Sequence, residues 1–280
     1  LNYQNEDETV ENLVETVTNN FNISNRFYKV KAKMMKKDKL HYWDRSAPVG
    51  KINKKFDFDS TVDIIRNAFD KIDQKYRDIF DDYLKNGQIS VFPKTGKTSG
   101  AYCSSGIGLP TFVLLNHTDD LNSVTTVAHE MGHAFHGELS SKQDLIYRDY
   151  TISVAEVAST FFENFVFDEL LDSLSDNEKV IALHDKILGQ VSTIFRQIAC
   201  FNFEKELHEV IRKEGYVSKE VIAKLLNKHM KSYIGPAMEF EESDGYQFAS
   251  WGHIRRYFYV YSYAFGSLIS NALYAEYQKD

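Results

Sequence analysis

A histidine, glutamate and histidine pattern at residues 129–133 has the residue types and spacing for metal chemistry. His129, Glu130 and His133 lie in the stretch VAHEMGHAFHGELSS, residues 127–141. On a helix the two histidines are one turn apart on the same face, where they can bind one Zn²⁺. Glu130 lies beside them and can reach a zinc-bound water, whose pKa zinc lowers to about 7. The pattern predicts glutamate-assisted hydrolysis, and its alternative is a polar patch on an ordinary helix.

A hydrolytic zinc site also needs a third protein ligand and an open position for water. Glu156 is the best-placed acidic residue after the motif. It lies in ISVAEVASTFFENF, where Glu156, Ser159 and Glu163 share one helical face. Their apolar neighbours would make these charges costly to bury without a cation or hydrogen-bond partners. We expect Glu156 to bind the metal and Ser159 and Glu163 to lie in the supporting layer behind the ligands, Glu163 holding a ligand imidazole. The alternative is an exposed acidic stripe.

A third histidine, His136, follows the motif on the same predicted helix. It is seven residues from His129, about 10 Å along the helix axis, so one ion can hardly bind all three histidines. We therefore expect His136 to make a structural hydrogen bond rather than to bind the metal.

The elements that position these residues are mainly helical. Capping residues at 119–123 precede a helical rhythm of apolar residues through the motif. One long amphipathic helix is predicted over DFDSTVDIIRNAFDKIDQKYRDIFDDYLKNG, residues 57–87. Similar periods predict helices over residues 10–21, 154–171, 178–212, 218–233 and 254–277.

Residues 86–120 depart from this pattern, because they are rich in Gly, Ser, Thr and Pro with short runs of β-formers. We expect a small sheet from strands at 89–92, 101–104 and 111–116, with residues 40–43 as an optional further strand. The edge of such a sheet could bind an extended peptide, although a purely structural hairpin fits the sequence almost as well.

Composition sets the wider frame. The chain has 280 residues, 43% of them apolar, and no internal repeat or low-complexity linker, so a single domain over residues 1–280 is expected. A net charge of -7 spread along the chain argues against nucleic acid as a partner. The two cysteines, far apart, fit a reducing cytoplasm, and no apolar run is long enough for a membrane span. The start at Leu1 suggests a fragment or a processed product.

The chain resembles the thimet oligopeptidase and oligoendopeptidase F family of zinc metallopeptidases. The resemblance is carried by HEMGHAFH, by the glutamate of AEVASTFFENF 23 positions after His133, and by YWDRSAP, AYCSS, PTFVLLNHTDDLNSVTTVAHE and WGHIRRYFYVYSYAFG. These segments run in collinear order over nearly the whole chain and are most similar to the oligoendopeptidase F branch. The expected fold is thus a multi-helical zinc metallopeptidase catalytic domain with a small β-sheet beside the active-site helix.

The resemblance also implies roles for individual residues. His129, His133 and Glu156 match the ligands of one Zn²⁺ per chain, and Glu130 matches the general base. His253, Tyr263 and Tyr259 resemble the side chains that orient substrate and stabilise the transition state, as donors to an oxyanion could. Tyr257 matches less well, and Arg256 stands where an aromatic residue is often found. For any one tyrosine, core packing is the alternative.

Family members are considerably longer and use an N-terminal helical region as the opposite wall of a deep channel. This chain resembles only the C-terminal catalytic part. The expected function is hydrolysis of short peptides by a zinc-dependent metalloendopeptidase. The alternative is a half-enzyme, inactive alone, which acts as a zinc-binding helical assembly module with an N-terminal half as partner. Hydrolysis of non-peptide amides is also compatible with the motif.

Overall fold

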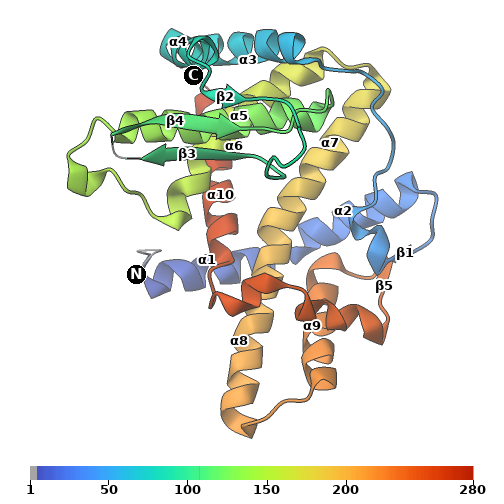
Figure 1. Ribbon diagram of the computed structural model, residues 1–280. Helices are drawn as coiled ribbons and strands as arrows, with labels where there is room; N and C mark the ends of the chain where they lie inside the picture. The colour runs from blue at the N-terminus through green and yellow to red at the C-terminus, as the bar shows by residue number, and fades with distance from the viewer. Residues whose placement is uncertain (1–4, 107, 280) are drawn as a thin grey trace. The chain divides into compact units, whose positions relative to one another are not determined.

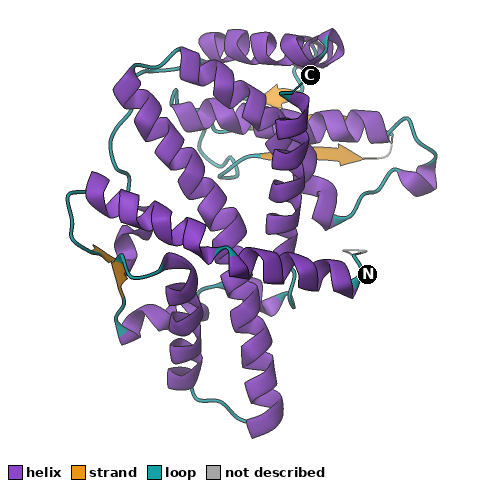
Figure 2. Cartoon of the chain, turned by 180° about the vertical axis from the view of Figure 1, so that it is seen from behind, coloured by secondary structure: helices purple, strands orange, loops and turns teal. Residues whose placement is uncertain are grey.

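Helices make up most of the chain in the computed structural model, which describes residues 5–106 and 108–279 (Figures 1 and 2). The mainly helical fold with small sheets predicted from the sequence is therefore confirmed. The chain forms two compact units, residues 1–51 with 183–268 and residues 52–182 with 269–280. The single domain expected from the sequence stays a prediction. None of the helices described is long and apolar enough to cross a membrane.

The unit formed by residues 52–182 and 269–280 carries the HEMGH motif, residues 129–133. Its helices surround one apolar core, in which the ring centroids of Phe69, Phe135 and Phe162 lie 4.8 to 5.7 Å from one another. Edge-to-face packing of this kind fixes the helices that contribute the rings. The elements of this unit are α3 (Phe58–Ile72), α4 (Gln74–Lys85), β2 (Ile89–Ser90), β3 (Tyr102–Gly106), β4 (Leu109–Leu114), α5 (Leu121–Ser140), the 3₁₀ turn η2 (Leu145–Tyr147) and α6 (Ile152–Asp172).

The single helix predicted over residues 57–87 is wrong, because α3 and α4 are separate. Asp73 breaks the helix with an extended backbone, φ -170° and ψ 131°, and its carboxylate accepts a hydrogen bond from the Lys75 backbone N–H at 3.0 Å. Asp is a strong helix N-cap, so this residue begins α4 as it ends α3. The periodicity of the apolar residues continues through Asp73, so the sequence pattern did not reveal the break.

The predicted small sheet is confirmed, with the strand order β2-β4-β3. β4 pairs antiparallel with β3, Cys103 opposite Val113, and parallel with β2, Ile89 opposite Val113. β3 and β4 both pack against α5, so the sheet lies along the helix that carries the HEMGH motif (Figure 1).

The optional strand at residues 40–43 does not belong to this sheet. β1 (Leu40–His41) pairs in parallel with β5 (Met238–Glu239), within the unit formed by residues 1–51 and 183–268. The pairing partner is almost 200 residues away in sequence, and no local pattern specifies it.

The unit formed by residues 1–51 and 183–268 is also built around one apolar core, to which Tyr28, Ile198, Phe203 and Tyr233 contribute. Its other elements are α1 (Asp7–Asn19), α2 (Phe21–Met34), the 3₁₀ turn η1 (Tyr42–Ser46), the π-helical segment η3 (Val191–Arg196), α8 (Gln197–Glu214), α9 (Lys219–Ile234), and the 3₁₀ turns η4 (Glu242–Ala249) and η5 (Gly252–Arg255). Two helices, α7 (Asp176–Gln190) and α10 (Tyr261–Tyr277), contribute residues to both units.

The last predicted helix begins later than its aromatic periodicity indicated. Residues 254–260 are not α-helical, and α10 begins at Tyr261. Tyr257 and Phe258 adopt φ values of 47° and 59°, the left-handed region that ends helices and that residues other than glycine seldom adopt. The predicted helix over residues 254–277 is therefore wrong in its first seven residues.

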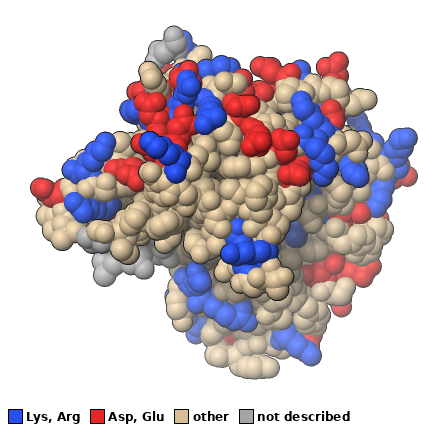
Figure 3. Space-filling view, turned by 45° about the horizontal axis from the view of Figure 1, so that its top comes forward, with Lys and Arg blue, Asp and Glu red and all other residues tan. Residues whose placement is uncertain are grey.

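Charges of both signs occur together on the surface. Figure 3 shows Lys and Arg side chains interspersed with Asp and Glu over the upper part of the face in view. The described residues also form ion pairs, such as Arg66 with Asp81 at 2.6 Å and Lys228 with Glu206 at 2.7 Å.

Candidate metal centre and active site

The HEMGH motif lies in the middle of α5, with its two histidines on the face turned toward α6. Asp120 begins the helix by accepting a hydrogen bond from the Ser123 backbone N–H at 2.7 Å. The apolar residues Val127, Met131 and Phe135 are fully buried and fix the rotation of the helix. His129 and His133 then share one face, with ring centroids 4.9 Å apart. The sequence thus presents both imidazoles in the same direction, as a shared metal requires.

Gly132 lets α6 come close enough to bring a carboxylate to these histidines. A Cβ at this position would lie 2.6 Å from the Cα of Ser159 and 2.8 Å from the carbonyl oxygen of Ala158. Contacts below 3.0 Å are essentially never made by real Cβ atoms. The two helices therefore touch backbone to backbone at Gly132, which no other residue type permits without moving them. Sequence reasoning did not find this role, although a glycine inside a strong helical pattern was a usable signal.

His129, His133 and Glu156 come together at this contact. The Glu156 Oε2 atom lies 3.3 Å from His129 Nε2 and 3.5 Å from His133 Nε2. One ligand atom from each residue falls within 4.8 Å of the others. Tetrahedral ligands at about 2.0 to 2.2 Å from zinc are about 3.4 Å apart, so both the donor types and their spacing fit Zn²⁺. The three side chains are 19% to 36% exposed, which leaves a metal accessible to water.

The charges of the cluster favour an ionised carboxylate. Burial opposes this, but hydrogen bonds to His129 and His133 hold the pKa of Glu156 well below its ordinary value. Burial likewise disfavours a charged His129, but Glu156 and Glu163 raise the pKa of His129 to about 10. Without a metal, His129 is therefore protonated at neutral pH, and its positive charge is the partner of the two carboxylates. A metal ion would replace that proton as the partner of the two carboxylates.

Two further side chains orient the cluster from behind. The Nδ1 atom of His129 lies 3.3 Å from Glu163 Oε2, and Ser159 Oγ donates a hydrogen bond to Glu156 Oε2 at 2.9 Å. Ser159 is completely buried, so this hydroxyl is held in place. A carboxylate on the far nitrogen of a ligand histidine fixes the ring orientation and the tautomer. The helical face that Glu156, Ser159 and Glu163 were predicted to share is the one that meets α5.

Glu130 is 6% exposed and lies beside the cluster without belonging to it. Burial raises its pKa, while the neighbouring His129 and His133 and a hydrogen bond to the backbone of Cys103 lower it. Cys103 lies in β3, so the sheet helps to orient this carboxylate. A carboxylate with a raised pKa beside a metal site can accept a proton from water and return it, which suits Glu130 to act as a general base.

His136 does not belong to the metal cluster. Its ring stacks on that of Tyr150, with centroids 3.7 Å apart and planes inclined by 13°. The expected structural hydrogen bond is not found at Nδ1, which is buried without a partner among the residues described. The ring is held by its stacking on Tyr150.

His253, Tyr259 and Tyr263 form a hydrogen-bonded group of their own. His253 Nδ1 is hydrogen-bonded to the hydroxyl of Tyr259, which lies 3.1 Å from the hydroxyl of Tyr263. Burial and the positive charges of Arg196 and Arg256 lower the pKa of His253, so it is neutral near pH 7. Tyr257 is 72% exposed and takes no part. These residues and the predicted zinc ligands lie in different units, and their approach to the metal stays a prediction.

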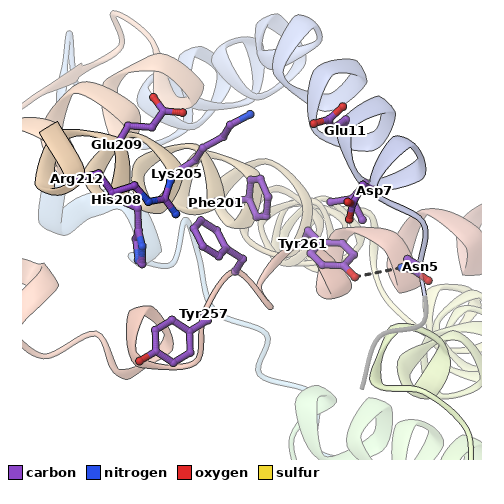
Figure 4. Close-up of a pocket in the computed structure, with 12 residues that line it drawn as sticks. Asn5, Asp7, Glu11, Phe201, Lys205, His208, Glu209, Arg212, Tyr257 and Tyr261 are labelled. Atoms are coloured by element: carbon purple, nitrogen blue, oxygen red, sulfur yellow. Dashed lines mark hydrogen bonds between the residues drawn. The ribbon is translucent and has the colours of Figure 1, made fainter. Parts of the chain in front are cut away.

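A pocket of about 600 Å³ adjoins the turn at Tyr257 and Phe258 (Figure 4). Residues of α1 and α8 line its other sides, and Asn5 donates a hydrogen bond to the Tyr261 hydroxyl at 3.4 Å. None of its lining residues is one of the predicted catalytic or metal-binding side chains.

Residues 2–280 match the model of a protein family, Peptidase family M3. The chain belongs to this family. Among its relatives, an oligoendopeptidase F homolog of Borreliella burgdorferi is 31% identical over 94% of this chain and 45% of its own length. The resemblance to the oligoendopeptidase F family that the motifs indicated is thereby confirmed.

Solved structures of similar proteins agree with this chain in fold. A Chlamydophila abortus protein provisionally described as a peptidase superposes with a TM-score of 0.87, at 28% identity, over 98% of this chain and 47% of its own. Oligoendopeptidase F of Enterococcus faecium superposes with a TM-score of 0.70, at 20% identity, over 99% of this chain and 43% of its own. The chain thus spans less than half the length of these relatives.

Proposed function

We propose that this chain is the catalytic portion of a zinc-dependent metalloendopeptidase that hydrolyses short peptides. The observation that carries the proposal is the convergence of His129, His133 and Glu156 within 4.8 Å beside the buried Glu130. A structural zinc site needs no carboxylate next to its ligands and normally has its fourth position closed. Membership of Peptidase family M3 supports the same reaction class.

In this proposal one Zn²⁺ per chain is held by His129, His133 and Glu156. When bound, the metal supplies a Lewis acid that polarises a peptide carbonyl and acidifies water. Glu130 takes the proton of the attacking water and passes it to the leaving amine. Burial suits Glu130 to this exchange, because it brings the pKa of the carboxyl closer to that of the groups it serves. Glu163 and Ser159 keep the His129 ring and the Glu156 carboxylate in position.

We further propose that His253 and Tyr263 donate hydrogen bonds to the substrate and to the oxyanion that forms on its carbonyl, and that Tyr259, whose hydroxyl donates to His253 Nδ1, holds the two in place. The support is their mutual hydrogen bonding, which places the three polar groups side by side. A neutral His253 suits this role, because it can donate from one ring nitrogen while the other bonds Tyr259. Donors aimed at a developing charge are among the largest single contributions to catalysis.

The second candidate is a half-enzyme that binds zinc but needs an N-terminal half to act. Its support is the length of the relatives, of which the chain covers 41% to 45%. In that case the chain is an assembly module whose partner supplies the rest of the substrate site. The cytoplasmic location expected from the cysteines stays a prediction.

A blocked, internally quenched peptide of about eight residues tests the proposal, because acetylated and amidated ends exclude exopeptidases. Zinc-loaded chain should cleave it, whereas metal-free chain and the Glu130→Gln variant should not. Stoichiometric zinc without hydrolysis would favour the assembly module. Hydrolysis that is unaffected by both metal removal and Glu130→Gln would contradict the proposed mechanism.

A further inference from the structure

The turn between His253 and Tyr259 is strained at two successive residues. Tyr257 and Phe258 have φ values of 47° and 59°. This left-handed conformation is unfavourable for bulky side chains, so it persists only where the surrounding structure holds it. His253 precedes the turn, Tyr259 follows it, and the two are hydrogen-bonded to one another. Their alignment therefore depends on what holds the turn.

One buried carboxyl group supports this turn directly. Glu204 of α8 is 1% exposed, and its Oε1 atom accepts a hydrogen bond from the Phe258 backbone N–H at 2.8 Å. Two neighbours on the same face of α8, Phe201 and His208, pack their rings against that of Phe258. The ring centroids lie 5.7 and 4.9 Å from the Phe258 centroid. Figure 4 shows Phe201 and His208 on this helix and Tyr257 in the turn. One hydrogen bond and two ring contacts thus stabilise the left-handed backbone at Phe258.

Burial of the Glu204 carboxyl group costs free energy at this position, and the hydrogen bond from Phe258 offsets part of that cost. Its neighbours along the helix, Phe203 and Leu207, belong to the apolar core, and its Oε2 atom is buried without a partner in the part of the chain described. Burial raises the pKa of Glu204, opposed by the hydrogen bond from Phe258. A leucine would fill the same space without this desolvation cost but could not accept a hydrogen bond.

We propose that Glu204 is a positioning residue that fixes the Phe258 backbone and thereby aligns His253, Tyr259 and Tyr263. Its catalytic consequence rests on the proposed function of those three side chains, whereas the anchoring itself does not. Glu204 acts only through the turn and does not contact the substrate.

Three variants separate anchoring from general stability. Glu204→Leu removes the acceptor, Glu204→Gln keeps a neutral acceptor, and Leu207→Ala weakens the same helix through the core alone. Hydrogen exchange at the Phe258 amide should accelerate about tenfold in Glu204→Leu and stay near wild type in the other two, as expected for one lost hydrogen bond. The ¹⁵N signals of the His253 ring should shift in Glu204→Leu alone, because its bond to Tyr259 loosens.

Peptide hydrolysis gives the functional readout. We expect kcat to fall about tenfold in Glu204→Leu with unchanged zinc content, and to recover in Glu204→Gln. Unchanged Phe258 exchange and His253 signals in Glu204→Leu, or the same changes in Leu207→Ala, would overturn the proposal. A loosened turn with wild-type kcat would overturn its catalytic part. A zinc-loaded wild-type chain that cleaves no peptide would count against the proposed function, while exchange and ring signals would still decide the anchoring.

Discussion

Gly132 of α5 lies directly on the Ser159 backbone of α6, so close that a Cβ at Gly132 would come within 2.6 Å of the Ser159 Cα. One turn before Ser159, Glu156 reaches the two histidines that flank Gly132. The separation of the two helices and the geometry of the metal site are therefore set by the same contact.

Substitution of Gly132 by alanine should destabilise the chain although alanine favours helix formation. The added methyl has no room, and overpacking of this kind costs about 1 to 3 kcal/mol, more than the roughly 1 kcal/mol gained in helix propensity. Urea unfolding measures the change. Gly189→Ala is the matched control, because a Cβ there meets nothing within 4 Å and should stabilise the chain slightly. A Gly132→Ala chain as stable as Gly189→Ala, with unchanged zinc affinity, would refute the role of this contact.

Glu130→Gln should retain stoichiometric zinc and lose most turnover. The amide keeps the shape of the side chain but cannot accept a proton, and general-base catalysis contributes about 10²- to 10⁴-fold. Metal analysis and peptide hydrolysis on the same sample check both parts. Glu138→Gln is the control on the same helix, since its hydrogen bond from Tyr83 at 2.7 Å survives the change. Lost zinc with retained activity would reverse the roles of ligand and base.

Tyr263→Phe should lower kcat without altering zinc content. Removal of one donor to an oxyanion typically costs about 2.7 to 4 kcal/mol, or about 10² to 10³ in rate. Steady-state hydrolysis of the quenched peptide measures it. Tyr277→Phe, which changes a partly exposed tyrosine near the end of the same helix, should have wild-type rates. If Tyr263→Phe also turns over at the wild-type rate, the tyrosine packs the core and the donors lie elsewhere.

Zinc binding should release a proton from His129. In the metal-free chain Glu156 and Glu163 raise the pKa of His129 to about 10, so the ring is charged at neutral pH and must lose its proton to bind metal. Apparent zinc affinity should therefore rise about tenfold per pH unit below that pKa. Calorimetry near pH 7.5 in buffers of different ionisation enthalpy counts the protons. The count should fall in Glu163→Gln, and a count of zero in the wild-type chain would contradict this charge distribution.

Local chemistry explains which parts of the site could be predicted from the sequence. His129, Glu130 and His133 lie within five consecutive positions of one helix, so their relative placement follows from helix geometry alone. Glu156 was found because a charge among small apolar residues requires a partner. The β-rich stretch between residues 86 and 120 was located from its Gly, Ser, Thr and Pro content and its short runs of β-formers.

Tertiary contacts explain what sequence reasoning missed. The break at Asp73 and the left-handed turn at Tyr257 and Phe258 interrupt apolar patterns that continue on both sides. The pairing of β1 with β5 joins residues about 200 positions apart. The closeness of Gly132 to Ser159 depends on how two helices pack, which periodicity does not encode.

The central claim is that His129, His133 and Glu156 together bind one Zn²⁺. The most direct measurement is the zinc content, after extensive dialysis, of the wild-type chain and of the His133→Ala, Glu156→Ala double variant, with circular dichroism to verify that both are folded. The geometry predicts one zinc per wild-type chain and none in the folded double variant. One zinc retained by the folded double variant would contradict it.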